Sequence, residues 1–99
     1  MSSLRPICFA DALRHLHSLL GAEVKVTVND HGRFFGCGFE GTLERVQTLP
    51  PDDKVVRLVL RGGAGIFLDP ADVRVFESRE DQHVSLEIRV TEGPTVTID

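Results

Sequence analysis

Residues 33–48 read RFFGCGFEGTLERVQT, a pattern typical of one long β-strand with glycines in its interior. Side chains alternate between the two faces of a strand, so Phe35, Cys37 and Phe39 share one face. The interior glycines are Gly36, Gly38 and Gly41. Glycines inside a strand mark a bend, a bulge or a close backbone approach. We therefore expect this strand to bend and to let a small sheet curl into a barrel.

The segments on either side of this strand predict one helix and several further strands. Apolar residues with helical spacing predict a helix over residues 7–20, ended by Gly21 in a left-handed conformation. Its apolar stripe consists of Phe9, Leu13, Leu16 and Leu20. Alternating apolar residues then predict five strands within residues 23–76. These strands are residues 23–28, 33–48, 54–61, 66–68 and 73–76. A final alternation over residues 83–98 predicts an added C-terminal hairpin, which extends the barrel sheet or pairs with the same hairpin of a second subunit.

Length and composition limit the class of protein. The 99 residues predict a single domain spanning residues 1–99, and the formal net charge of −4 argues against a simple basic surface for nucleic acid. No apolar run approaches the roughly 20 residues of a membrane helix, and residues 1–6 lack the apolar segment of a signal peptide. We therefore expect a cytoplasmic protein with no membrane partner and with Cys8 and Cys37 reduced.

The order of one helix and five short strands, with a bent and glycine-bearing second strand, resembles the Sm-like family of small SH3-type barrels. The likeness covers residues 9–76 and rests on the segments LLGAEVKV (19–26), GRFFG (32–36), FEGTL (39–43), VRLVLRG (56–62) and IFLDPADV (66–73). It implies a ring of about five to seven subunits, closed by pairing of exposed edge strands. It also implies RNA binding, which many members of the family share.

The residues that bind RNA in that family do not carry over to this chain. Residues 44–47 read ERVQ where Sm proteins have an Asp and an Asn in the loop after the second strand. Residues 68–70 read LDP where the bacterial RNA-chaperone branch has a Tyr-Lys-His triplet. The resemblance therefore implies the fold without the family's RNA site.

Two groups of residues suggest metal or nucleophilic chemistry, and each has a simpler structural interpretation. His15 and His17 diverge by about 200° around a helix, so a shared metal would need Cys8 or a carboxylate as well. We expect both histidines to face water. A catalytic Cys37 would need a nearby base and a cationic environment. In an apolar strand pattern we expect this cysteine to be a small hydrophobic residue instead.

Two turns could also be mistaken for sites. Asp69 and Asp72 resemble a carboxylate pair, but the DPAD sequence is a natural turn in which Asp accepts backbone hydrogen bonds. Residues 62–65 read GGAG and lack the lysine and the following helix of a phosphate-binding loop. We therefore expect no catalytic residue, no metal site and no cofactor, and we do not expect an enzyme.

Four arginines form the best candidate contact site: Arg33, Arg45, Arg57 and Arg61. Arg57 and Arg61 share one face of a predicted strand, and Arg45 could join them across a neighbouring strand. Such a patch could hold a nucleic-acid backbone or an acidic partner. The same arginines could instead form weak surface ion pairs with neighbouring acidic residues, namely Glu40, Glu44 and Asp53.

The six phenylalanines are the only aromatic residues, and their apolar surroundings predict that most lie in the core. They are Phe9, Phe34, Phe35, Phe39, Phe67 and Phe76. The sequence as a whole favours a non-catalytic module that acts by forming homo-oligomers and by contacting a protein partner. The alternative is an Sm-like RNA-binding protein that uses the four arginines.

Overall fold

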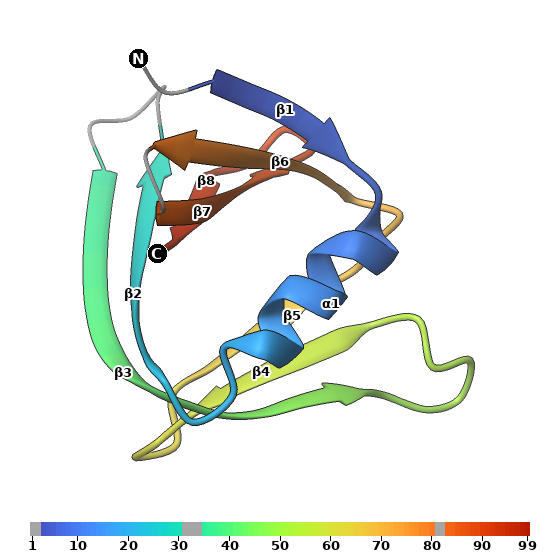
Figure 1. Cartoon of the computed structure of the whole chain (residues 1–99). Helices are drawn as coiled ribbons and strands as arrows, with labels where there is room; N and C mark the ends of the chain where they lie inside the picture. The colour runs from blue at the N-terminus through green and yellow to red at the C-terminus, as the bar shows by residue number, and fades with distance from the viewer. Residues whose placement is uncertain (1–2, 31–34, 81–82) are drawn as a thin grey trace.

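The computed structural model describes residues 3–30, 35–80 and 83–99, which form one antiparallel sheet and one helix (Figure 1). The elements are β1 (Ser3–Ile7), α1 (Phe9–Ser18), β2 (Glu23–Asp30), β3 (Phe35–Thr48), β4 (Val56–Leu60), β5 (Gly65–Leu68), β6 (Val73–Glu80), β7 (His83–Val90) and β8 (Thr95–Ile98). The order of strands across the sheet is β1-β6-β7-β8-β2-β3-β4-β5. The described part of the chain is therefore mostly β, with the predicted helix near its N-terminus.

The long strand β3 bends as the sequence predicts and joins two halves of the sheet (Figure 1). Its first half pairs with β2, from Asp30 opposite Phe35 to Glu23 opposite Thr42. Its second half pairs with β4, and the register shifts between Leu43 and Arg45. Such a shift leaves an extra residue on one strand and increases its bend. The irregularity follows the last of the strand's glycines and is the place where the sheet begins to curl.

The predicted five-stranded barrel with an added hairpin is not confirmed, because the described strands form one open sheet of eight. The strands of the predicted hairpin, β7 and β8, lie in the middle of this sheet between β6 and β2. In this position their inward side chains are buried. Leu86, Ile88 and Ile98 are at most 2% exposed, and burying them in the common core is favourable. The two edges of the sheet are β1 and β5.

Several boundaries also differ from those predicted. The strand β1 precedes the helix, and it ends at Ile7, so the helix begins at Phe9 rather than at residue 7. The strand β6 continues through a charged segment to Glu80, beyond the predicted end at residue 76. Pairing with β1 on one side and β7 on the other explains this length, because each flanking strand binds the backbone of residues up to Arg79.

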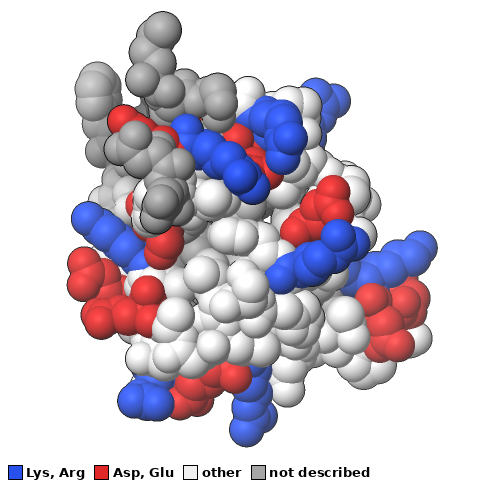
Figure 2. Space-filling view, viewed as in Figure 1, with Lys and Arg blue, Asp and Glu red and all other residues white. Residues whose placement is uncertain are grey.

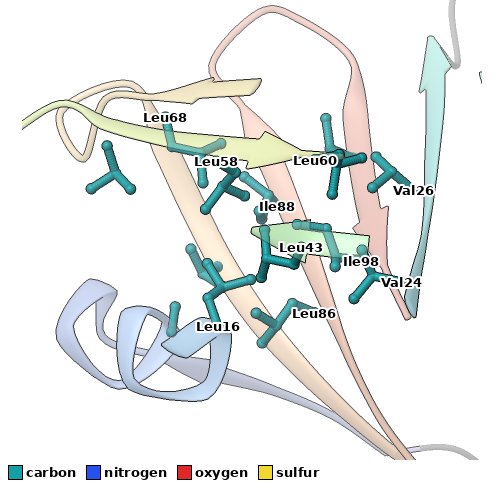
Figure 3. Close-up of a cluster of buried hydrophobic side chains, with 14 residues drawn as sticks. Leu16, Val24, Val26, Leu43, Leu58, Leu60, Leu68, Leu86, Ile88 and Ile98 are labelled. Carbon is teal, nitrogen blue, oxygen red and sulfur yellow. The ribbon is translucent and has the colours of Figure 1, made fainter. Parts of the chain in front are cut away.

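Aliphatic side chains from α1 and from the inner face of the sheet form the core (Figure 3). Leu16 of α1 points toward Leu43 of β3 and Leu86 of β7, and all three are at most 1% exposed. Leu20 was expected on the same helical stripe, but it is 41% exposed. The helix ends at Ser18, so helical spacing no longer applies at Leu20. Gly21 has the predicted positive φ, 85°, and its N–H donates to the Leu43 carbonyl.

Phe9 and Phe39 are half-buried and pack against this core, whereas Phe67 and Cys37 lie outside it, contrary to expectation. Among the side chains that the structure describes, none of the phenylalanines is fully buried, and Phe67 is 63% exposed. Cys37 is exposed as well. It stands on the inward face opposite Val28, beyond buried Val26 and half-buried Phe39, so this row of side chains extends past the edge of the core. Position along the strand, and not the face alone, decides burial here.

The helix in the described part of the chain has 10 residues and is neither long nor apolar enough to cross a bilayer.

Candidate interaction surface

The structure brings two of the four predicted arginines together on the outer face of β3 and β4. Arg57 lies opposite Gln47 and Arg45 lies opposite Val59, so the two arginines are diagonal neighbours. The third, Arg61, follows β4 and is exposed. The fourth, Arg33, lies outside the described residues. The described part of the predicted patch therefore consists of Arg45 and Arg57, with Arg61 beyond the end of β4.

Arg61 forms one of the surface ion pairs that the sequence suggested. Its Nε lies 3.3 Å from Glu44 Oε1, and the two side chains are 73% and 42% exposed. An ion pair this exposed contributes little to stability. It nevertheless places a negative charge beside Arg61, which weakens the attraction of that arginine for a nucleic-acid backbone.

An exposed phenylalanine completes this surface, although the apolar surroundings of the phenylalanines in the sequence predicted that most of them lie in the core. Phe67 of β5 lies directly opposite Arg57 of β4, and the Arg57 Cζ is 5.8 Å from the centre of its ring. The distance is within the range of a cation–π contact. Arg57 Nε is buried and has no hydrogen-bond partner among the described residues. The alternation of side chains along a strand could have predicted this outward position of Phe67, because its neighbour Leu68 is an apolar residue that points inward.

The strand β5 is an edge of the sheet, and part of its backbone is directed away from the sheet. Leu60 N–H donates to the Ala64 carbonyl just before β5. Alternate residues of a strand direct their backbone groups to opposite sides, so Ile66 and Leu68 bond to β4. Gly65 and Phe67 therefore direct their N–H and C=O groups away from β4. Both residues are exposed.

The other edge strand, β1, is less suited to further pairing. It contains Pro6, which has no N–H to donate to an added strand. Proline on an edge is one of the devices that protect sheets from unwanted pairing. Leu4 is nevertheless 46% exposed on β1 and provides an apolar side chain for comparison with Phe67.

The two glycine- and proline-containing segments that resembled sites form turns. Asp69 Oδ1 accepts a hydrogen bond from Ala71 N–H at 3.0 Å, which confirms the predicted turn. Gly62 and Gly63 have φ values of 97° and 98° in the connection from β4 to β5. Both cysteines are free. Within residues 3–30, 35–80 and 83–99, no three His, Cys, Asp or Glu side chains are grouped as metal ligands would be.

Comparisons with protein-family models, with curated proteins and with solved structures find no match to this chain. The resemblance to the Sm-like family therefore stays a prediction from the sequence.

Proposed function

We propose that this chain is a non-catalytic protein-interaction module that associates with a second copy of itself through β5. The observation that carries the proposal is the exposure of Phe67, 63%, on an edge strand whose backbone is directed away from the sheet. A large exposed apolar side chain beside unpaired strand groups favours addition of another strand. The protected edge at β1 makes β5 the better of the two candidates.

Two β5 strands can pair antiparallel about a two-fold axis at Ile66. In this register Gly65 of each copy lies opposite Phe67 of the other, and these are the residues whose backbone groups are directed outward. About four backbone hydrogen bonds would form. Each Phe67 ring would then cover the glycine of the partner, an arrangement known to stabilise strand pairing at glycines.

The proposed interface is small, so the association should be weak. β5 has four residues, and pairing of such strands buries less surface than a standard stable interface. We expect a dissociation constant in the micromolar range, about 1–100 μM. The Arg45 and Arg57 side chains lie on the outer face beside this edge and provide contacts for an acidic protein partner as well.

Sedimentation equilibrium over a range of protein concentrations tests the proposal. The unchanged protein should approach a dimer as its concentration rises above about 100 μM. Phe67→Glu should remain a monomer, because it removes the aromatic cover and places two like charges near the axis, on either side of it. Leu4→Glu is the matched control, since it makes the same change on the protected edge β1 and should still form a dimer.

Three results would contradict this arrangement. A protein that stays monomeric at all concentrations would refute self-association. Equal behaviour of the Phe67→Glu and Leu4→Glu variants would refute the role of β5. A closed ring of about five to seven copies would refute the two-fold pairing and favour the ring that the Sm-like resemblance implies.

RNA binding is the second candidate function, and the pairing of Arg57 with exposed Phe67 favours it. Bases stack on exposed aromatic side chains, and arginines bind the adjacent phosphates. Fluorescence anisotropy with a labelled oligouridine at low salt tests it. Binding that weakens with salt and is lost in Arg45→Gln would support an RNA site. That variant leaves Phe67 intact and should not alter self-association, so the two functions can be separated.

A further inference from the structure

A small polar pocket is lined by side chains of α1, β1, β6 and β7. Its volume is about 310 Å³, near the lower limit for sites that bind small molecules. Six ionisable side chains line it: Arg5, Asp11, Arg14, His15, Glu77 and Arg79. Figure 2 shows basic and acidic side chains next to each other on the face that carries α1 and β1. This pocket is distinct from the surface around Phe67.

Glu77 is the central residue of the pocket and stands on the inward face of the sheet. It follows buried Val75 in the alternation of β6, and its side chain is 11% exposed. Arg79 Nε donates to one of its carboxylate oxygens at 2.6 Å, and Arg5 Nη2 donates to the other at 2.7 Å. These two hydrogen bonds lower the pKa of Glu77 below its ordinary value, and the bond from Arg79 has the larger effect. The buried carboxylate is therefore fully paired and ionised.

The same two bonds fix the guanidinium groups while leaving donors free for a ligand. A guanidinium carries five N–H donors, and Glu77 uses the Nε of Arg79 and one terminal nitrogen of Arg5. The side chains of both arginines are 67% exposed, so their remaining N–H groups are accessible. Positioned guanidinium groups of this kind bind oxyanions strongly and with defined geometry.

His15 also lines the pocket. The sequence predicted that this histidine faces water, but its Nε2 is buried and has no hydrogen-bond partner among the described residues. Buried polar atoms in native proteins normally have a partner. Asp11, four residues earlier on the same helix, lies 3.4 Å from Arg14 and is thus paired with another residue. Because its Nε2 has almost no exposed surface, His15 forms part of the pocket wall and is not a hydrogen-bonding group for a ligand.

We propose that this pocket binds a small monocarboxylate with a short apolar body. Three arginines and two carboxylates line it, so a single negative charge on the ligand balances the charged side chains. The free N–H groups of Arg5 and Arg79 hold the carboxylate. Ile7 forms the accessible apolar part of the wall and contacts the body of the ligand, because Leu86, which also lines the pocket, has no exposed surface.

Titration with sodium butyrate, followed by NMR of the backbone amides, arginine Nε–H groups and histidine ring, tests the proposal. Butyrate should give saturable shifts at Arg5, Arg79 and His15, with a dissociation constant of about 1 mM or tighter. Butyramide has the same shape without the charge and should bind at least about tenfold more weakly. Arg79→Gln should weaken butyrate about tenfold or more, whereas Arg61→Gln, which changes an exposed arginine elsewhere, should have no effect.

Absence of saturable shifts in the unchanged protein up to about 50 mM butyrate would overturn the proposal, and this result does not depend on any variant folding. Equal affinity for butyrate and butyramide would overturn the role of the arginines. Tighter binding of inorganic phosphate than of butyrate at the same residues would overturn the assignment to a monocarboxylate. Shifts confined to residues outside the pocket would overturn its location.

Discussion

Replacement of Glu77 by Gln tests how much the buried carboxylate contributes to stability. The carboxylate accepts two charge-assisted hydrogen bonds, each worth about 1.5–3 kcal/mol. Glutamine keeps one acceptor oxygen and turns an NH₂ group toward the second guanidinium, so one bond is lost and a donor faces a donor. Both arginines are 67% exposed and can be solvated by water, which limits the loss. We expect a decrease of about 2 kcal/mol in the free energy of unfolding.

Thermal unfolding measures this decrease. For a domain of this size, about 2 kcal/mol corresponds to a fall of roughly 10 °C in Tm. The matched control is Glu44→Gln, which breaks the exposed pair with Arg61 and should cost at most about 0.5 kcal/mol. Equal shifts of Tm in the two variants would refute the claim that Glu77 is a buried and fully paired carboxylate.

The dependence on pH gives a second measurement on the same variant. The pKa of Glu77 is lower in the folded protein than in the unfolded chain, because Arg79 and then Arg5 hydrogen-bond to the ionised form. The unfolded state therefore binds the proton more readily, and the stabilisation is complete above the ordinary pKa of glutamate. It is lost as the pH falls through the lowered folded-state pKa. The difference in stability between the unchanged protein and Glu77→Gln should thus be largest near neutral pH and shrink in acid. A difference that stays constant with pH would contradict this cause.

Two further predictions concern burial. Leu43→Ala should lower the free energy of unfolding by about 3 kcal/mol, because Leu43 is 1% exposed, whereas Leu20→Ala should cost less than about 1 kcal/mol, because Leu20 is 41% exposed. Urea denaturation of both variants checks this, and similar costs would contradict the burial of Leu43. Cys8 and Cys37 are both exposed, so both thiols should react with Ellman's reagent in the folded protein, and a thiol that reacts only after denaturant is added would contradict its position.

Local patterns in the sequence predicted most of the elements of this fold. Alternation located β2, β4, β7 and β8 to within a few residues, because each carries an apolar face that a strand must bury. The glycines of residues 36–41 correctly indicated that β3 bends. Helical spacing located α1, although not its first residue. These successes depend on interactions between residues that are close in the chain.

Local sequence patterns could not predict how these elements are arranged in the sheet. The strand β8 pairs with β2, and β1 pairs with β6, although more than sixty residues separate the partners in each case. No local feature of residues 95–98 specifies β2 as a neighbour. The strand β1 was missed because its sequence, SLRPI, contains a proline and lacks a clear alternation. Pairing with β6 makes it a strand, and this contact lies far along the chain.

The candidate sites, too, depend on strand pairing that local sequence patterns do not predict. The sequence predicted that Arg45 and Arg57 could meet across neighbouring strands, and the register of β3 and β4 places them as diagonal neighbours. It did not predict that Phe67 is the residue opposite Arg57, because this depends on the register of β5. Nor did it predict the group formed by Arg5, His15 and Glu77, since these residues come from three separate elements.

In most of the sheet, apolar side chains face inward and polar side chains face outward. Each of the two proposed sites contains a residue that breaks this rule. Phe67 is a large apolar side chain on the outer face, and Glu77 is a charged side chain on the inner face. Each departure has a cost: the first exposes apolar surface to water, and the second removes a carboxylate from it. The arginine pairs offset the second cost within the chain, whereas the ring of Phe67, which lies beside Arg57, stays 63% exposed. Positions that break a local rule are expected where a protein binds something else. The exposed ring therefore points to a partner that covers it, and the paired carboxylate points to a ligand that uses the arginines it holds in place.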